Sequence, residues 1–272
     1  MKVKVNAKIN IGLKVTGMAG DLHTLDGLFH SIDLCDEFDF SGKEIVVKDM
    51  TEEIELERYK KYLVDLLAAH NIDGGVKVVK RIPLGGGLGG GSTASVAIAA
   101  YLEKSGKRVG EKFLKSLGSD VPFMFKGGFA RVKGTGDEIS FLPPLNRFAL
   151  LVKAGTVSTK DAYRLCDETE RENFSITDVL ENLILDSDNF EVPNDLYKAA
   201  VKLNDEIEGV FEFVKQYGCP CFMSGSGSTI VALSDKKEKL SKIENDINSA
   251  FKNSEKFFKK IVKFEKIGKS AN

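Results

Sequence analysis

The feature that most constrains this chain is a run of glycines between residues 85 and 91. Six of these seven positions are glycine, and the whole chain holds 26 glycines, whereas an average protein of this length has about 19. A single loop therefore accounts for most of the excess. Because glycine lacks a Cβ atom, its backbone takes positive φ values and approaches a ligand closely, at a large cost in conformational entropy. This composition predicts a ligand-binding loop.

The glycine run leads directly into a segment, residues 92–102, that is typical of a buried helix. The first N–H groups of a helix have no partner within the helix, and they lie at the positive end of its dipole. Hydroxyl side chains at the helix start add further donors, so the loop and the helix together suit a polyphosphate. The expected binding segment consists of Pro83, Leu84, Gly85, Gly86, Gly87, Leu88, Gly89, Gly90, Gly91, Ser92 and Thr93.

Two common glycine-loop patterns fit this run poorly. A Walker-type phosphate loop needs a lysine directly before Ser92, where this chain has Gly91. The dinucleotide pattern G-x-G-x-x-G fits Gly85, Gly87 and Gly90, but that pattern usually lies in the first βα turn, and here more than 80 residues precede it. A turn that needs glycine only for tight packing stays open as an alternative.

Composition and charge narrow the class of protein. Hydrophobic residues make up 42% of the chain and charged residues 29%, which excludes a disordered or collagen-like chain. The 39 basic and 40 acidic side chains give a net charge of −1, so no basic excess indicates nucleic acid. Cys35, Cys166, Cys219 and Cys221 are too few for a disulfide scaffold. We expect a soluble protein of the reducing cytoplasm, with no membrane or nucleic-acid partner.

Hydrophobic periodicity predicts an α+β chain in two lobes. Residues 3–15 alternate strictly between apolar and polar, which predicts a half-buried strand or hairpin that Gly17 and Gly20 should break. Pro143-Pro144 is the best candidate for a boundary, which divides the chain into residues 1–145 and 146–272. Helices are expected at 56–67, 92–102, 113–117 and 240–251 and throughout much of 174–217, with strands at 28–40, 76–79, 129–139, 149–152, 230–233 and 261–267.

Several residues are candidates for a functional site, although a structural role would also explain each of them. Lys8 and Asn10 share the polar face of the first strand, which solvent alone would explain. Asp120 stands two residues before a proline and suits the N-cap of a helix. His23 lies in a predicted loop, and Tyr163 suits the core side of a helix. The residues alone leave these alternatives open.

Five motifs, spread along nearly the whole chain, resemble those of one family. They are Ala7-Lys8-Ile9-Asn10, His23-Thr24-Leu25 with Leu28-Phe29, the glycine segment 83–93, Gly118-Ser119-Asp120-Val121-Pro122-Phe123, and Ser224-Gly225-Ser226-Gly227-Ser228-Thr229. In this order they resemble the GHMP kinase superfamily, most of all the branch that phosphorylates the 2-hydroxyl of 4-diphosphocytidyl-2-C-methyl-D-erythritol in the non-mevalonate isoprenoid pathway. The resemblance implies a ribosomal-protein-S5-like N-terminal lobe, a ferredoxin-like C-terminal lobe and an active site between them.

The resemblance also implies a role for each candidate residue. Asp120 matches the catalytic base and Lys8 the catalytic lysine, whose ammonium stabilises the carboxylate. Asn10 and His23 match contacts to a small cytidyl substrate, and Tyr163 is placed as an aromatic platform for its cytosine. ATP and Mg²⁺ are expected, since Mg²⁺ neutralises the β- and γ-phosphates. The metal ligands and the oligomeric state are not assigned.

The chain departs from that branch at four places. Leu22 replaces a tyrosine, Asn6 a proline, and Ala94 an Asp or Asn, and residues 56–61 lack the asparagine that contacts adenine. Two alternatives therefore remain. One is another GHMP kinase, of the sugar, homoserine or mevalonate type. The other is a non-catalytic nucleotide-binding protein, which has no reason to keep Lys8 and Asp120 together.

Overall fold

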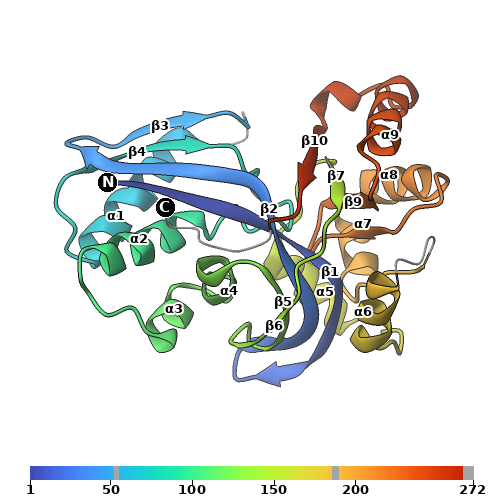
Figure 1. Cartoon of the computed structure of the whole chain (residues 1–272), viewed down its shortest axis with the longest axis horizontal. Coiled ribbons are helices and arrows are strands. Elements are labelled where there is room, and N and C mark those ends of the chain that lie inside the picture. The colour runs from blue at the N-terminus through green and yellow to red at the C-terminus, as the bar shows by residue number, and fades with distance from the viewer. Residues whose placement is uncertain (52–54, 186–189, 266–272) are drawn as a thin grey trace.

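The computed structural model describes residues 1–51, 55–185 and 190–265, which form two sheets with their helices (Figure 1). The first is a six-stranded sheet of order β3-β4-β2-β5-β6, with β1 paired to β2. Its strands are β1 (Lys2–Ala19), β2 (Leu22–Gly42), β3 (Val46–Asp49), β4 (Gly75–Lys80), β5 (Phe129–Gly134) and β6 (Glu138–Leu142). Its helices are α1 (Leu56–Ala69), α2 (Thr93–Lys104), α3 (Glu111–Leu117) and α4 (Val121–Lys126).

The second sheet is four-stranded, of order β10-β7-β9-β8. It contains β7 (Phe148–Lys153), β8 (Cys221–Met223), β9 (Thr229–Ser234) and β10 (Phe258–Lys263). The helices on this side are α5 (Thr159–Asp167), α6 (Ile176–Ile184), α7 (Tyr197–Leu203), α8 (Glu206–Lys215) and α9 (Lys237–Ala250). The change of sheet falls between β6 and β7, and the domain boundary at 145/146 stays a prediction. None of the described helices is long and apolar enough to cross a membrane.

The alternating strand β1 is longer than its pattern predicts. The expectation that Gly17 breaks it is wrong, because a register shift between Val15 and Gly17 absorbs the glycine and pairing with β2 continues to Ala19. Both strands therefore reach from the side of α1 and α2 to the side of α5 and α6 (Figure 1). Because of this length, β1 packs in the hydrophobic cores of both halves of the molecule.

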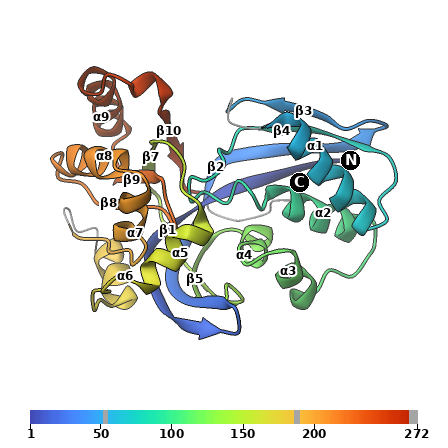
Figure 2. The same ribbon diagram turned by 180° about the vertical axis from the view of Figure 1, so that it is seen from behind.

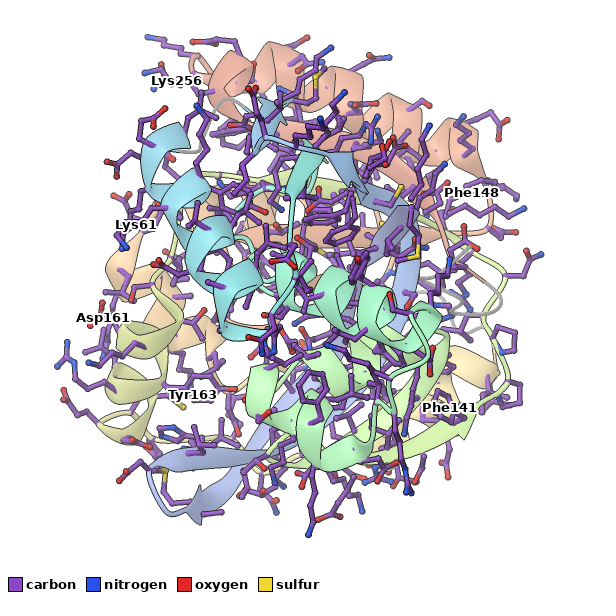
Figure 3. The ribbon with its side chains drawn as sticks, turned by 90° about the vertical axis from the view of Figure 1, so that its left-hand side faces the viewer. Lys61, Phe141, Phe148, Asp161, Tyr163 and Lys256 are labelled. Atoms are coloured by element: carbon purple, nitrogen blue, oxygen red, sulfur yellow. The ribbon has the colours of Figure 1, made fainter. Side chains whose placement is uncertain are left out.

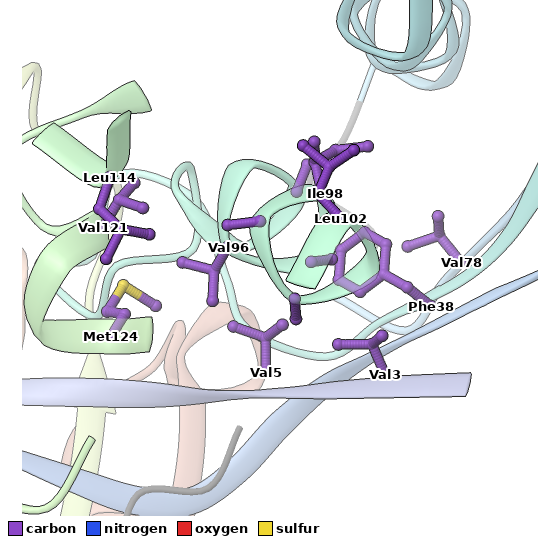
Figure 4. Packing of buried hydrophobic residues seen from close by; sticks show 14 of the residues in the cluster. Val3, Val5, Phe38, Val78, Val96, Ile98, Leu102, Leu114, Val121 and Met124 are labelled. Carbon is purple, nitrogen blue, oxygen red and sulfur yellow. The ribbon is translucent and has the colours of Figure 1, made fainter. Parts of the chain in front are cut away.

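The apolar face of β1 enters three successive clusters of core residues. Val3 and Val5 pack with Phe38 and the helix α2 in the first cluster (Figure 4). Ile9 and Ile11 belong to the cluster between the two sheets, and Leu13 and Val15 belong to that of the C-terminal half. The polar face does not stay solvated throughout, since Lys8 and Asn10 are only 5% and 1% exposed. The prediction of a half-buried strand is therefore correct only near the ends of β1.

Most other predicted elements are confirmed. The buried helix after the glycine run is α2, the pair of strands around Gly134 is β5 and β6, and the helical region 174–217 contains α6, α7 and α8. The last strand begins earlier than expected, at Phe258, and residues 266 and 267 of the predicted strand lie outside the described residues. Periodicity did not predict the strands β3 and β8 or the helices α4 and α5.

His30 joins the two halves of the molecule. Its ring lies between those of Phe129 and Phe264, with centroid distances of 5.0 and 4.3 Å. Nδ1 lies 2.8 Å from the Ser31 carbonyl oxygen, and Nε2 accepts a hydrogen bond from the N–H of Leu145, in the segment between the sheets. Burial lowers the pKa of His30 from 6.5 to about 4, because the charged imidazolium is poorly solvated there.

This shift predicts a pH-dependent stability. Between pH 6.5 and about 4 the unfolded chain binds a proton at His30 that the folded chain does not, so the free energy of unfolding falls as the pH decreases. The loss amounts to roughly 3 kcal/mol at most. Denaturant unfolding of the wild type and His30→Gln at pH 7 and in this acidic window should show a shallower loss in the variant. An equally steep loss in both proteins would contradict the assignment.

Candidate active site

The centre of the site is a buried lysine on β1. Lys8 Nζ donates to Asn10 Oδ1 at 2.6 Å and lies 3.4 Å from Asp120 Oδ2. It also lies over the ring of Phe29, 5.2 Å from the centroid. Alternation along β1 places Lys8 and Asn10 on one face, and the burial of that face brings their polar ends together. The alternative that these two residues merely face solvent is therefore wrong.

Asp120 stands directly before α4, as a capping residue would. Its side chain nevertheless makes no capping hydrogen bond, and it faces Lys8 across the 3.4 Å contact. The carboxylate keeps 31% of its surface exposed, while Lys8 is buried. An anion thus stands at the edge of the site with a cation behind it.

The glycine loop packs tightly against the turn that precedes β9. The carbonyl oxygens of Gly85 and Gly86 accept hydrogen bonds from the N–H groups of Ser228 and Thr229. Gly87 has a φ of +72°, and a Cβ atom there would collide with the carbonyl oxygen of Ser224. Tight packing therefore explains part of the glycine run. Gly91 differs, because a Cβ atom there would meet nothing within 4 Å.

Ser224 links this loop to β1. Its hydroxyl accepts a hydrogen bond from the N–H of Asn10 at 3.1 Å and donates to the Gly87 carbonyl oxygen at 2.9 Å. The Gly89 backbone lies on the other side of the loop, where an added Cβ would stand 2.6 Å from Met124 Sδ and 3.4 Å from Lys8 Cγ. The glycine segment, Lys8, Asn10 and the residues around Asp120 consequently form one site.

A fully buried ion pair, which the motifs did not indicate, holds both ends of the loop. Lys80 Nζ donates to Asp36 Oδ2, to the Ile82 carbonyl oxygen at 2.8 Å and to the Gly90 carbonyl oxygen at 2.9 Å. The Thr93 hydroxyl lies 2.7 Å from Asp36 Oδ2 and 3.1 Å from the Gly90 carbonyl oxygen. Since both of those atoms are acceptors, the Thr93 hydroxyl donates its proton in a hydrogen bond to Asp36. Periodicity marks Asp36 only as part of a strand, and Lys80 lies just beyond the predicted strand 76–79, so sequence reasoning missed the pair.

His23 and Tyr163 form a second part of the site. Their rings stack with centroids 4.6 Å apart. Figure 3 shows Tyr163 pointing inward from α5 while Asp161 points outward, and in Figure 2 α5 lies beside the curved hairpin of β1 and β2. Burial raises the pKa of Tyr163, and the negative charge of Asp120 raises it further. The ring pair therefore belongs to the same electrostatic surroundings as the carboxylate.

The chain also matches known protein families. Residues 52–128 match the GHMP kinases N terminal domain, and residues 175–253 match the GHMP kinases C terminal model. A 4-diphosphocytidyl-2-C-methyl-D-erythritol kinase of Hydrogenobaculum sp. is 31% identical over 85% of this chain and 87% of its own. The chain belongs to the GHMP kinase family. One of the same name from Enterococcus faecalis is 30% identical to this kinase, over 89% and 92% of the two chains.

Solved structures agree with the fold of this kinase. A crystal structure of 4-(cytidine 5'-diphospho)-2C-methyl-D-erythritol kinase has a TM-score of 0.73 and 25% identity, covering 97% of this chain and 99% of its own. A mevalonate kinase of L. major has a TM-score of 0.67 with 14% identity, covering 97% and 96%. The second likeness shows the fold alone. The predicted α+β, two-lobed GHMP kinase architecture is thereby confirmed.

The two kinds of glycine in the loop should respond differently to substitution. Gly87→Ala forces a side chain into the left-handed region and against Ser224, so we expect a lower melting temperature and loss of activity. Gly91→Ala meets open space, so it should keep the wild-type melting temperature and raise only the KM for ATP. Calorimetry and steady-state kinetics separate the two effects. Equal melting temperatures for both variants would contradict the packing account of Gly87.

Proposed function

We propose that this kinase transfers the γ-phosphoryl group of ATP to the 2-hydroxyl of 4-diphosphocytidyl-2-C-methyl-D-erythritol. The observation that carries the catalytic part is the contact between Lys8 and Asp120, 3.4 Å apart. A non-catalytic nucleotide-binding protein has no use for this pair. The substrate assignment is supported by the names of the relatives at about 30% identity and by the ring pair of His23 and Tyr163.

The residues divide the proposed reaction between them. Asp120 accepts the proton of the attacking hydroxyl as its oxygen approaches the γ-phosphorus. The Lys8 ammonium stabilises that carboxylate and the negative charge that develops on the attacking oxygen. Asn10, which accepts a hydrogen bond from Lys8, orients the lysine, and its amide N–H groups remain as donors for substrate oxygens. The glycine segment and the start of α2 hold the phosphates of ATP.

The proposed reaction also uses Mg²⁺ together with ATP. This ion is usually held by one or two protein oxygens together with substrate phosphates and water. Within residues 1–51, 55–185 and 190–265 no group of three or more His, Cys, Asp or Glu side chains could hold a metal, which fits an ion carried mainly by the nucleotide. The Ser92 hydroxyl at the start of α2 would contact it, and once bound it would neutralise charge on the β- and γ-phosphates.

The remaining parts of the proposal concern the cellular setting. The four cysteines are free thiols, and three of them are buried, which supports a reducing cytoplasm. The balanced charge supports a small-molecule substrate and no nucleic-acid partner. A coupled ADP-release assay with the cytidyl substrate, mevalonate, homoserine and simple sugars tests the function. Preferred phosphorylation of one of the last three would replace the substrate while keeping the reaction.

Removal of either member of the catalytic pair should abolish most of the turnover. We expect Lys8→Ala and Asp120→Asn each to lower kcat by ~10²-fold or more, since positioned acid–base groups contribute at least this much. Lys4→Ala is the matched control, because Lys4 lies on the same strand with 63% of its side chain exposed. The control should keep wild-type kcat. Wild-type turnover in both catalytic variants would refute the assignment.

The ring of Tyr163 should act on binding alone. An aromatic platform contributes roughly 1–3 kcal/mol per stacked base, so Tyr163→Ala should raise KM for the cytidyl substrate at least several-fold. Tyr163→Phe keeps the ring and should keep the KM. Because neither change touches the reacting atoms, kcat should stay near the wild-type value. A raised KM for ATP instead would place this ring at the nucleotide.

A further inference from the structure

The carboxylate of Asp167 is hydrogen-bonded to the imidazole of His23, which the proposed function places in contact with cytosine. His23 Nε2 lies 2.8 Å from Asp167 Oδ2. The other carboxylate oxygen, Oδ1, accepts a hydrogen bond from Arg171 NH2, also at 2.8 Å. Asp167 is the last residue of α5 and stands four residues after Tyr163, so both side chains lie on one side of the helix. One helix thus supplies the ring that stacks on His23 and the acid that holds it.

The acid decides which nitrogen of His23 carries the proton. An ionised carboxylate only accepts hydrogen bonds, so the nitrogen that faces it is the protonated one. In a neutral imidazole this leaves Nδ1 as an acceptor. In the part of the chain that the structure describes, His23 uses only Nε2 for hydrogen bonding. Nδ1 is therefore free to accept a bond from a ligand.

We propose that Asp167 is a positioning residue that makes the site selective for cytosine over uracil. This inference rests on the proposed function, in which His23 contacts the base. Cytosine presents an amino group, which is a donor, where uracil presents an oxygen, which is an acceptor. An accepting Nδ1 pairs with the amino group and leaves the uracil oxygen unpaired. Asp167 thereby excludes the wrong base without touching it.

Arg171 determines how the side chain is oriented in the substitution Asp167→Asn. Arginine only donates hydrogen bonds, so it takes the amide oxygen of the asparagine, as it takes Oδ1 of Asp167. The amide NH2 group then faces His23 Nε2, which must become the acceptor. The proton moves to Nδ1, and the ligand-facing nitrogen changes from acceptor to donor. The variant should therefore lose its preference for cytosine.

Two measurements test this inference. The first is the ¹⁵N chemical shift of the imidazole nitrogens, recorded well above the usual titration range of histidine. The chain has 3 histidines, and His30 supplies a reference of the opposite tautomer, because its Nδ1 faces a carbonyl oxygen. We expect His23 to carry its proton on Nε2 in the wild type and on Nδ1 in Asp167→Asn. An unchanged tautomer would overturn the inference.

The second measurement is the binding of cytidine diphosphate and uridine diphosphate by calorimetry. The ratio of the two affinities should fall about tenfold in Asp167→Asn, as expected for one exchanged hydrogen bond. Asp161→Asn is the control, since Asp161 lies on the same helix with 46% of its side chain exposed, against 45% for Asp167. This control should keep the wild-type ratio.

Kinetics separate a failure of this inference from a failure of the proposed function. With the cytidyl substrate, Asp167→Asn should raise KM and leave kcat within about twofold of the wild type. A wild type that phosphorylates no cytidyl substrate would refute the proposed function, while the nucleotide-binding ratio still decides the role of Asp167. An unchanged ratio, or a wild type without preference for cytidine diphosphate, would overturn that role.

Discussion

The buried ion pair of Asp36 and Lys80 sets the shape of the segment on which the site depends. Removing two charges from water costs several kcal/mol per ion, which their mutual attraction offsets only when further hydrogen bonds complete the geometry. Here Asp36 also accepts from the N–H groups of Arg81 and Ile82 and from the Thr93 hydroxyl, while Lys80 also donates to two loop carbonyls. The pair therefore joins β2, β4, the loop and the start of α2. Loss of either partner would leave a buried charge at the base of the loop.

Held at its base by this pair, the glycine loop meets the C-terminal half along its other edge. The segment between β8 and β9, together with the first residue of β9, is hydrogen-bonded to the carbonyl oxygens of Gly85, Gly86 and Gly87. Ser224 of this segment also accepts a hydrogen bond from the N–H of Asn10 in β1. Packing accounts for most of the glycines in the run, whereas the proposed binding of ATP accounts for Gly91. The first part serves the joint between the two halves, whereas Gly91 stands in open space beside the helix start. The conformation of the glycine loop thus depends on contacts from both halves of the molecule.

The sequence predicted most elements, because periodicity reports which face of a strand or helix is apolar. It does not report whether the polar face is covered, so Lys8 looked the same as Lys2 and Lys4 although only Lys8 is buried. Only the resemblance to a family distinguished Lys8 from its neighbours on the strand. The pairs Asp36–Lys80 and His23–Asp167 join residues 44 and 144 positions apart. No local pattern encodes such pairs, since they depend on how distant strands and helices pack.

Two carboxylates of the candidate site differ in their partners. Asp120 lies 3.4 Å from the Lys8 ammonium and keeps 31% of its side chain exposed. Asp167 faces an imidazole and an arginine, and it acts through the ring that it holds. Burial and the charge of Asp120 raise the pKa of the Tyr163 phenol. This phenol therefore stays protonated and does not act as a base. In the proposed reaction Asp120 is therefore the base, and the inferred task of the two rings is to recognise cytosine.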